Sequence, residues 1–255
     1  MTSVKFLWRP FRSEWSKSTK TFLPWLCILA PILHAVLIYL TLYHAGDSII
    51  KPGANVWESL AAQSFQGLYL IFLQLAASIL IALVFQTDHQ ANMWKHLYAL
   101  PLPRWSVYTA KSLFAFLLIG ICLVFYSLLM PLAVALLSGR YPSWGLNNYI
   151  DAALTIFLPI ALKGWIACAA LCAIQSWISY RFRNFAIPLT FGLGATLAAA
   201  IVVQGWEYAI YYPYAFPVLS LAKQDYILLK SLLMGTFIFI LSILDAQRFY
   251  KSKAE

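Results

Sequence analysis

Six long apolar stretches, separated by short polar segments, dominate the hydrophobic pattern of the chain. A run of about 20 apolar residues can cross the hydrocarbon core of a bilayer as a helix. The predicted transmembrane helices are residues 21–43, 66–85, 112–137, 149–176, 186–204 and 225–244. The segments between them are too short to fold alone. The pattern therefore predicts an all-α integral membrane protein, with one membrane domain over residues 21–255.

The fourth apolar stretch is the least regular, because Lys163 and Gly164 interrupt it. A lysine inside a membrane is costly and is typical of a functional site. One interpretation places Lys163 against a cavity or a helix end within the membrane. The other divides the stretch into a short interfacial piece and a span that starts near Trp165. The sequence leaves both interpretations open.

Residues 1–20 have the pattern of an amphipathic helix. One arc of roughly 100° on a helical wheel carries apolar side chains, namely Val4, Leu7, Trp8, Phe11 and Trp15. The opposite side carries the basic residues Lys5, Arg9, Arg12 and Lys20. Such a helix lies in the headgroup plane of the membrane and attracts anionic lipid. The alternative is an unstructured basic tail.

Composition agrees with a membrane protein. Hydrophobic residues make up 62% of the 255 residues and charged residues 11%, whereas a soluble domain is about 25% charged. The formal net charge is +9. With the N-terminus in the cytoplasm, thirteen Lys and Arg residues fall on the inner side and three on the outer side. This positive-inside bias places both termini in the cytoplasm, and it explains the basic charge without a nucleic-acid partner.

Catalytic motifs are missing from the sequence. It contains no GxxxxGK[ST] phosphate loop, no HExxH zinc pair and no GxSxG nucleophile elbow. The four cysteines lie in apolar stretches and are interpreted as small hydrophobic residues. The chain is therefore not predicted to be an enzyme, and no catalytic, cofactor-binding or metal-binding residue is predicted in it.

The polar loop after the second predicted span suits a short helix from Asp88 to Tyr98. Asp88 would lie near the N-terminal end of that helix, where a carboxylate favours the helix dipole. Pro101 and Pro103 would end it. A short helix held below the membrane is either a docking element for a partner or a membrane-surface helix without one.

Aromatic residues crowd the segment after the fifth predicted span. They are Trp206, Tyr208, Tyr211, Tyr212, Tyr214 and Phe216. Trp and Tyr favour the membrane–water interface, so this segment is either an outer aromatic belt or a short re-entrant element on a substrate path. Candidate residues of such a path are Asp151, Lys163, Glu207, Tyr211 and Tyr212.

The loop also carries a resemblance to a known family. Three features lead into the third span. They are the acidic residue Asp88, the pair Trp94-Lys95, and the run Leu100-Pro101…Arg104, and Tyr108 and Lys111 follow them. This order resembles a signature of ABC transporter permeases of the exporter type-2 class. It is nearest the lantibiotic-immunity and bacitracin-resistance branch, in which Glu is more common at the position of Asp88. The N-terminal run Arg12-Ser13-Glu14-Trp15-x-Lys17, before a span with Pro31, is similar to the opening of that family.

The resemblance implies a division of labour between subunits. Two ATP-binding subunits on separate chains would carry ATP and Mg²⁺, and a second permease copy or a paralogue would complete the transporter. Residues 88–101 would form a coupling helix that contacts the ATPase through Asp88, His89, Asn92, Trp94, Lys95, His96, Pro101 and Arg104. Residues 1–20 would form an elbow helix with Leu7, Trp8, Phe11, Glu14 and Trp15.

The resemblance also implies a substrate class. An exporter of this branch would remove amphipathic antimicrobial peptides, such as lantibiotics, from a bacterial plasma membrane for self-immunity or resistance. A drug or a lipid-linked molecule is an alternative substrate. The alternative function is a membrane receptor or assembly protein that holds a cytoplasmic partner through the 88–101 helix without transport. An intramembrane enzyme would need a nucleophile or a metal pair at matching depth, which the sequence lacks.

Overall fold

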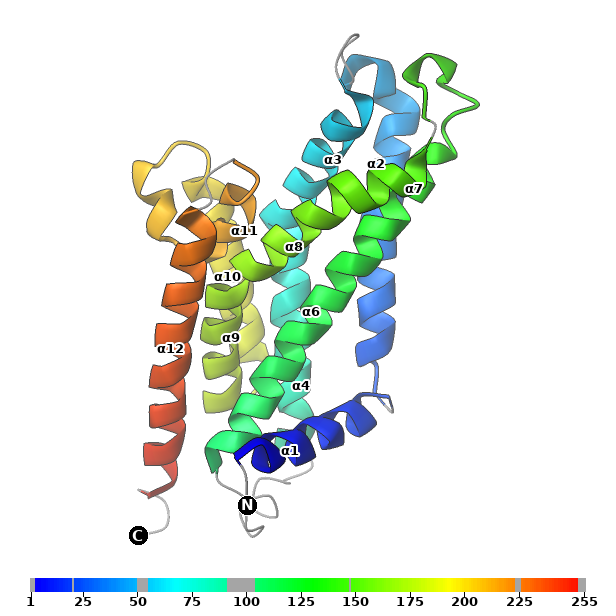
Figure 1. Ribbon diagram of the computed structural model, residues 1–255. Helices are drawn as coiled ribbons and strands as arrows, with labels where there is room; N and C mark the ends of the chain where they lie inside the picture. Colours follow the sequence, from blue (N-terminus) through cyan, green and yellow to red (C-terminus); the bar gives the residue numbers. More distant parts are fainter. Residues whose placement is uncertain are drawn as a thin grey trace.

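The computed structural model describes residues 3–19, 21–49, 55–90, 104–146, 148–222 and 226–251. All regular secondary structure in these ranges is helical. Figure 1 shows long helices that run between two ends of the molecule, with α1 lying across one of them. We call this end the α1 end; the last turns of α12 lie at the same end. The prediction of an all-α membrane protein is confirmed.

The first half of the chain contributes α1 (Ser3–Ser18), α2 (Leu23–Ile49), α3 (Val56–Gly67), the π-helical turn η1 (Leu68–Phe72), α4 (Leu73–Gln90) and α6 (Arg104–Ala135). The second half contributes η2 (Pro142–Trp144), α7 (Tyr149–Ala152), the π-helical turn η3 (Ala153–Phe157), α8 (Leu158–Ala167), α9 (Ala169–Arg181) and α10 (Ala186–Val202). The short elements η4 (Glu207–Tyr211), η5 (Pro213–Ala215) and α11 (Phe216–Leu219) precede the last helix, α12 (Tyr226–Lys251).

Five helical segments of the described chain are long and apolar enough to cross a membrane. They are Leu23–Gly46, Val56–Asp88, Trp105–Ala135, Tyr149–Ala167 and Tyr226–Ala246. The shorter apolar helix Ala186–Val202 lies at the fifth predicted span. The second segment is much longer than its predicted counterpart, because the helix extends through the polar residues on both sides of the apolar stretch.

The fourth predicted span is not one straight helix. It bends at Cys168, where α8 ends and α9 begins in a different direction (Figure 1). The hydroxyl of Ser231 on α12 donates to the carbonyl oxygen of Ala167 at 2.8 Å. Gly235, one turn further along α12, packs directly against the backbone of Ala169. The bend is tolerated because α12 supplies a hydrogen bond and close packing where the helix changes direction.

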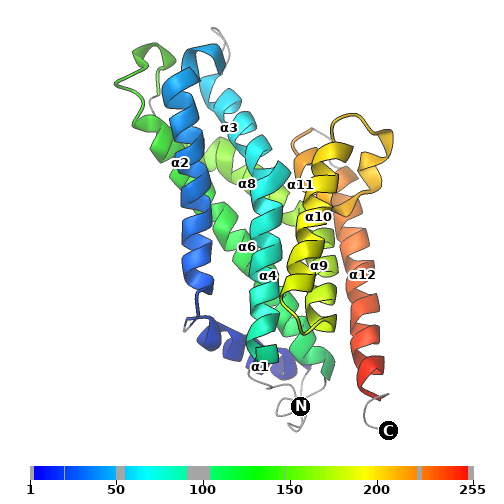
Figure 2. The same cartoon turned by 180° about the vertical axis from the view of Figure 1, so that it is seen from behind.

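Packing divides the helices into neighbouring groups. α12 packs mainly on α9, α2 on α6, and α4 on α9 and α10 (Figure 2). Aromatic side chains fill the space between α3, α6 and η3, where Phe65, Tyr126 and Phe157 are buried. Large apolar side chains on α2, α6, α10 and α12 remain exposed. Because these helices are long and apolar, the exposed faces suit contact with lipid.

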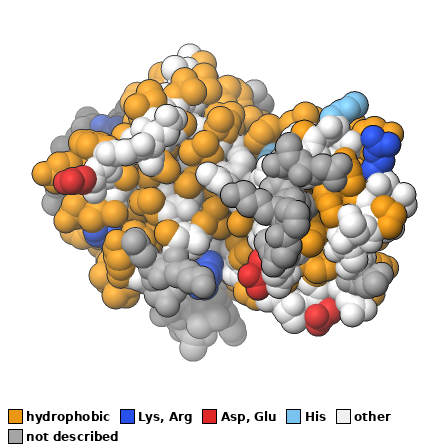
Figure 3. Space-filling model, turned by 90° about the horizontal axis from the view of Figure 1, so that it is seen from above, with side chains coloured by type: hydrophobic (Ala, Val, Ile, Leu, Met, Phe, Trp, Pro, Cys, Tyr) orange, Lys and Arg blue, Asp and Glu red, His pale blue; other side chains and the backbone are white. Residues whose placement is uncertain are grey.

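The opposite end of the molecule presents mostly hydrophobic side chains, with a few scattered charges (Figure 3). The segment from η4 to α11 lies at this end. Trp206, Tyr208 and Tyr211 are exposed, whereas Tyr214 and Phe216 are buried. The first part of the segment thus has the exposure of an aromatic belt, and the second part enters the helical bundle.

Candidate functional site

Four charged side chains form a closed ion-pair ring at the α1 end. Lys111 Nζ lies 2.8 Å from a carboxylate oxygen of Glu14 and 2.7 Å from one of Asp88. Lys17 Nζ lies 2.9 Å from the other oxygen of Glu14 and 3.0 Å from the other oxygen of Asp88. Each lysine therefore contacts both carboxylates, and the charges of the ion-pair ring cancel.

Three helices supply these side chains. Glu14 and Lys17 are three residues apart on α1, so they project from neighbouring positions of one face. Lys111 follows two turns after the start of α6, and it also donates to the carbonyl oxygen of Val84 on α4 at 3.1 Å. The ion-pair ring therefore fixes α1 against α4 and α6 at a single point.

Asp88 lies in the last turn of α4, not at the start of a separate helix as the sequence suggested. The C-terminal end of a helix disfavours a carboxylate, because the helix dipole is negative there. Lys17 and Lys111 offset this cost by direct contact. The Asp88 side chain is completely buried, so it acts on neighbouring helices and does not itself present a surface to a partner.

Burial makes the ion-pair ring sensitive to the loss of any member. The side chains of Asp88 and Lys111 are completely shielded from solvent, Glu14 is 7% exposed and Lys17 is 22% exposed. Burial opposes the charge of Lys17, but attraction to Glu14 and Asp88 outweighs it and raises the pKa of Lys17. Removing one partner would leave a buried charge without compensation.

The remaining predicted elbow residues face outward or pack on α6. Trp8 is 63% exposed and Trp15 50% exposed. Phe11 and Trp15 contact the ring of Phe114 edge-to-face, at centroid distances of 5.7 and 6.2 Å. Phe11 and the buried Glu14 thus face the protein, while the exposed parts of Trp8 and Trp15 can contact lipid headgroups. The position of Leu7 lies in α1, but its side chain is outside the described residues.

Most of the predicted coupling helix lies outside the described residues. This applies to Asn92, Trp94, Lys95, His96 and Pro101. His89 lies in α4 and Arg104 begins α6, and the side chains of both are also outside the described part.

Lys163 faces a cavity of about 410 Å³ between α3, α8 and the segment that follows α11. Glu58, Thr155 and Ser220 are among the other polar residues of its wall. This cavity therefore carries one acidic and one basic side chain. Lys163 is itself exposed, so both interpretations of its place in the sequence stay open, and Glu58 was not singled out by the sequence.

The other predicted path residues are not gathered around this cavity. Asp151 and Glu207 are exposed. The ring of Tyr211 lies under the ammonium of Lys230, 3.8 Å from its centroid. The hydroxyl of Tyr212 donates to the carbonyl oxygen of Ala195 on α10 at 2.9 Å. Glu207, Tyr211 and Tyr212 thus lie in or next to η4, whereas Asp151 lies on α7.

A buried polar chain joins the η5 segment to the bundle, and the sequence did not reveal it. Gln74 donates to the carbonyl oxygen of Tyr214 at 2.7 Å. The Tyr214 hydroxyl donates to Gln175 at 2.8 Å, and Gln175 donates to the carbonyl oxygen of Pro188 at 2.8 Å. The sequence signal for this polar chain was the presence of glutamines inside apolar spans, because a buried amide requires hydrogen-bond partners.

The model of one family, described as ABC-2 family transporter protein, matches residues 11–199, nearly three quarters of the chain. The match includes all four residues of the ion-pair ring. No curated protein and no solved structure matches the chain with significance.

Proposed function

The chain belongs to the ABC-2 family of transporter proteins, and on this premise we propose that it is the membrane permease of an ATP-driven exporter. ATP-binding subunits on separate chains supply ATP and Mg²⁺ and dock at the α1 end, which we assign to the cytoplasm. A second permease, identical or related, completes the assembly. We assign the protein to a bacterial plasma membrane, with the orientation set by its positive-inside bias.

The observation that carries this proposal is the contact between Asp88 and Lys111. Asp88 in the last turn of α4 and Lys111 in α6 belong to the two helices that flank the proposed coupling segment, and their ion pair joins these helices at 2.7 Å. Glu14 and Lys17 connect the same point to α1. A displacement of the coupling helix by the ATPase would therefore be transmitted to α1, α4 and α6 together.

In this mechanism the ion-pair ring is a joint between the ATPase and the transmembrane helices. A network of buried charges holds one geometry strongly, because a shift of one helix separates several charges at once. α1 lies across α6 and contacts it through Phe11 and Trp15. We infer that α1 acts as the elbow helix, with Trp8 and Trp15 in the headgroup region, where the indole ring is favoured.

We propose amphipathic antimicrobial peptides, such as lantibiotics, as the exported substrates, in self-immunity or resistance. The support is the chemistry of the end opposite α1. Exposed aromatic residues of the η4 segment can contact apolar side chains, and the exposed carboxylates of Glu207 and Asp151 can attract cationic ones. The cavity that holds Glu58 and Lys163 is bordered by Ser220 and Leu221, which directly follow α11.

The test begins with purification of the chain from its native membranes in mild detergent and mass spectrometry of the proteins that co-purify. We expect an ATP-binding subunit in near-equal amount, and a second permease if the assembly is heterodimeric. Absence of an ATP-binding subunit, even after chemical crosslinking, would contradict the permease proposal and favour a receptor or assembly protein.

The joint is then tested with a matched pair of variants. Asp88→Asn removes one charge of the ion-pair ring, and Asp245→Asn removes a partly exposed carboxylate that pairs with Arg181 and accepts from Trp177. In proteoliposomes, we expect Asp88→Asn to lower peptide-stimulated ATP hydrolysis at least tenfold while the ATP-binding subunit still co-purifies. Asp245→Asn should keep the stimulation. Full stimulation in both variants would exclude the joint.

A further inference from the structure

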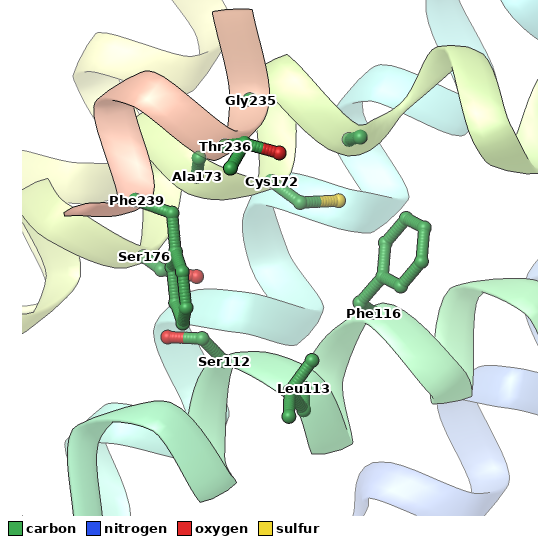
Figure 4. Close-up of a pocket in the computed structure, with 10 residues that line it drawn as sticks. Ser112, Leu113, Phe116, Cys172, Ala173, Ser176, Gly235, Thr236 and Phe239 are labelled. Atoms are coloured by element: carbon green, nitrogen blue, oxygen red, sulfur yellow. The ribbon is translucent and has the colours of Figure 1, made fainter. Parts of the chain in front are cut away.

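A cavity of about 180 Å³ lies between α6, α9 and α12, apart from the ion-pair ring and the Lys163 cavity (Figure 4). Leu113, Phe116 and Phe239 form most of its apolar wall. Figure 4 shows Phe116 and Phe239 on opposite sides of the space, with Leu113 between them. The cavity opens toward lipid, because Leu113 on α6 and Thr236 on α12 are exposed.

The rest of the wall is uncharged and combines small apolar residues with polar ones. It includes Ser112, Ser176, Thr236 and the thiol of Cys172. Ser176 is 1% exposed, and its hydroxyl has no hydrogen-bond partner among the described residues. A buried hydroxyl without a partner is unfavourable. A ligand that supplies a hydrogen-bonding atom to Ser176 would therefore be favoured.

The wall limits the charge and the size of an occupant. None of the described residues around the cavity is acidic or basic, so a charged group would lose its hydration without compensation. A cavity of about 150 Å³ holds a benzene molecule, and this one is slightly larger. Two facing phenylalanines favour an aromatic ring through offset or edge-to-face contacts.

We propose that this cavity binds a neutral aromatic alcohol, a phenol-type amphiphile, that enters from the lipid between α6 and α12. Its ring lies between Phe116 and Phe239, and its hydroxyl bonds to Ser176. A longer apolar tail extends past Leu113 into the membrane. Ser112 in the same wall directly follows Lys111 in α6, so an occupant contacts the turn that carries the ion-pair ring. The site requires no assumption about transport.

The test uses a photoreactive phenol that carries a diazirine group, with the full-length protein in lipid nanodiscs. After irradiation, labelled peptides are mapped by mass spectrometry. We expect labels at Leu113, Phe116 and Phe239, and competition by 4-propylphenol. Propylbenzene, which lacks the hydroxyl, and 4-propylbenzoate, which is charged, should compete weakly.

Two variants test the geometry of the site. Ser176→Ala should lower labelling about fivefold, which is the loss of affinity expected when one ordinary hydrogen bond is removed. Ala173→Leu should abolish labelling by filling the cavity, and it keeps the proposal testable if Ser176→Ala folds poorly. The matched control is Ser127→Ala on α6, whose hydroxyl bonds within its own helix to the carbonyl oxygen of Val124 at 2.8 Å.

Simple partitioning of the probe into lipid would give a different result. The label would then spread over lipid-facing residues such as Leu33 of α2 and Leu233 of α12. Propylbenzene would compete as well as 4-propylphenol, and Ser176→Ala would have no effect. Any of these three results would overturn the proposal.

Discussion

The ammonium of Lys111 lies 2.7 Å from a carboxylate oxygen of Asp88, and both side chains are completely shielded from solvent. The two residues belong to different helices, α6 and α4. Lys111 also contacts Glu14 on α1, so three helices depend on one buried charge. The net benefit of a buried ion pair is small, but the loss of one partner is costly, because the other charge remains in a dry environment.

The first prediction concerns Lys111→Met. We expect a loss of about 3–5 kcal/mol in unfolding free energy, because Asp88 and Glu14 lose their most buried partner. Thermal unfolding in detergent measures the loss. Adding Asp88→Asn should restore part of it, since the double variant again has balanced charges in the ion-pair ring.

Asp245→Asn is the control for this prediction. The pair between Arg181 and Asp245 is 41% and 29% exposed, and an exposed pair contributes about 0–1 kcal/mol. A loss in Lys111→Met as small as that in Asp245→Asn would contradict the role of burial.

The second prediction concerns pH. The folded protein raises the pKa of Lys17 above 10.5. The contribution of its charge to stability is therefore complete below the unfolded pKa and is lost as pH rises through the folded pKa. The difference in unfolding free energy between the native chain and Lys17→Gln should stay constant from about pH 6 to about pH 9 and shrink above about pH 10.5. A difference that changes between pH 6 and 9 would assign the effect to another group.

The third prediction compares two glycines in membrane helices. A Cβ atom at Gly235 would lie 2.9 Å from the carbonyl carbon of Ala169, whereas a Cβ at Gly194 would meet no atom of the described residues within 4 Å. Gly235→Ala should destabilise the protein by about 1–3 kcal/mol, because backbone cannot yield as a flexible side chain does. Gly194→Ala should be neutral or stabilise by up to about 1 kcal/mol through helix propensity. Equal melting temperatures for the two variants would show that close packing of α12 does not stabilise the bend at Cys168.

The fourth prediction tests the packing of α2 on α6. Cys27 on α2 and Cys122 on α6 lie on two helices that pack against each other. A membrane-permeant oxidant, copper phenanthroline, should link them into an intramolecular disulfide detectable by peptide mass spectrometry. Cys122→Ser should abolish that linkage. If the native chain forms disulfides only between molecules, α2 does not pack on α6 at Cys27 and Cys122.

The sequence predicted the helical class and the approximate spans because each span is a long apolar run, and hydropathy is a local property. It predicted less of the fourth span, since the bend at Cys168 depends on Ser231 and Gly235 from a distant helix. Nothing within residues 149–176 indicates those contacts.

The candidate site shows the same limit. Glu14 and Asp88 were singled out separately, as part of an elbow helix and of a coupling helix. Their common contact with Lys17 and Lys111 requires α1 to fold back across α4 and α6. A local pattern identifies which residues are charged, but it does not reveal which of them meet across helices.

The last prediction concerns the buried polar chain that holds the η5 segment. Gln175 accepts a hydrogen bond from Tyr214 and donates one to the carbonyl oxygen of Pro188. Gln175→Leu leaves both groups buried without that partner, at a cost of about 1–3 kcal/mol each. Amide hydrogen exchange of residues 212–219 should become faster, because Tyr214 loses its connection to α9. Gln204→Leu, which removes a bond from the turn after α10 to the carbonyl oxygen of Ala200, should leave this exchange unchanged. Slow exchange in Gln175→Leu would mean that the bond from Gln74 to Tyr214 holds the segment by itself.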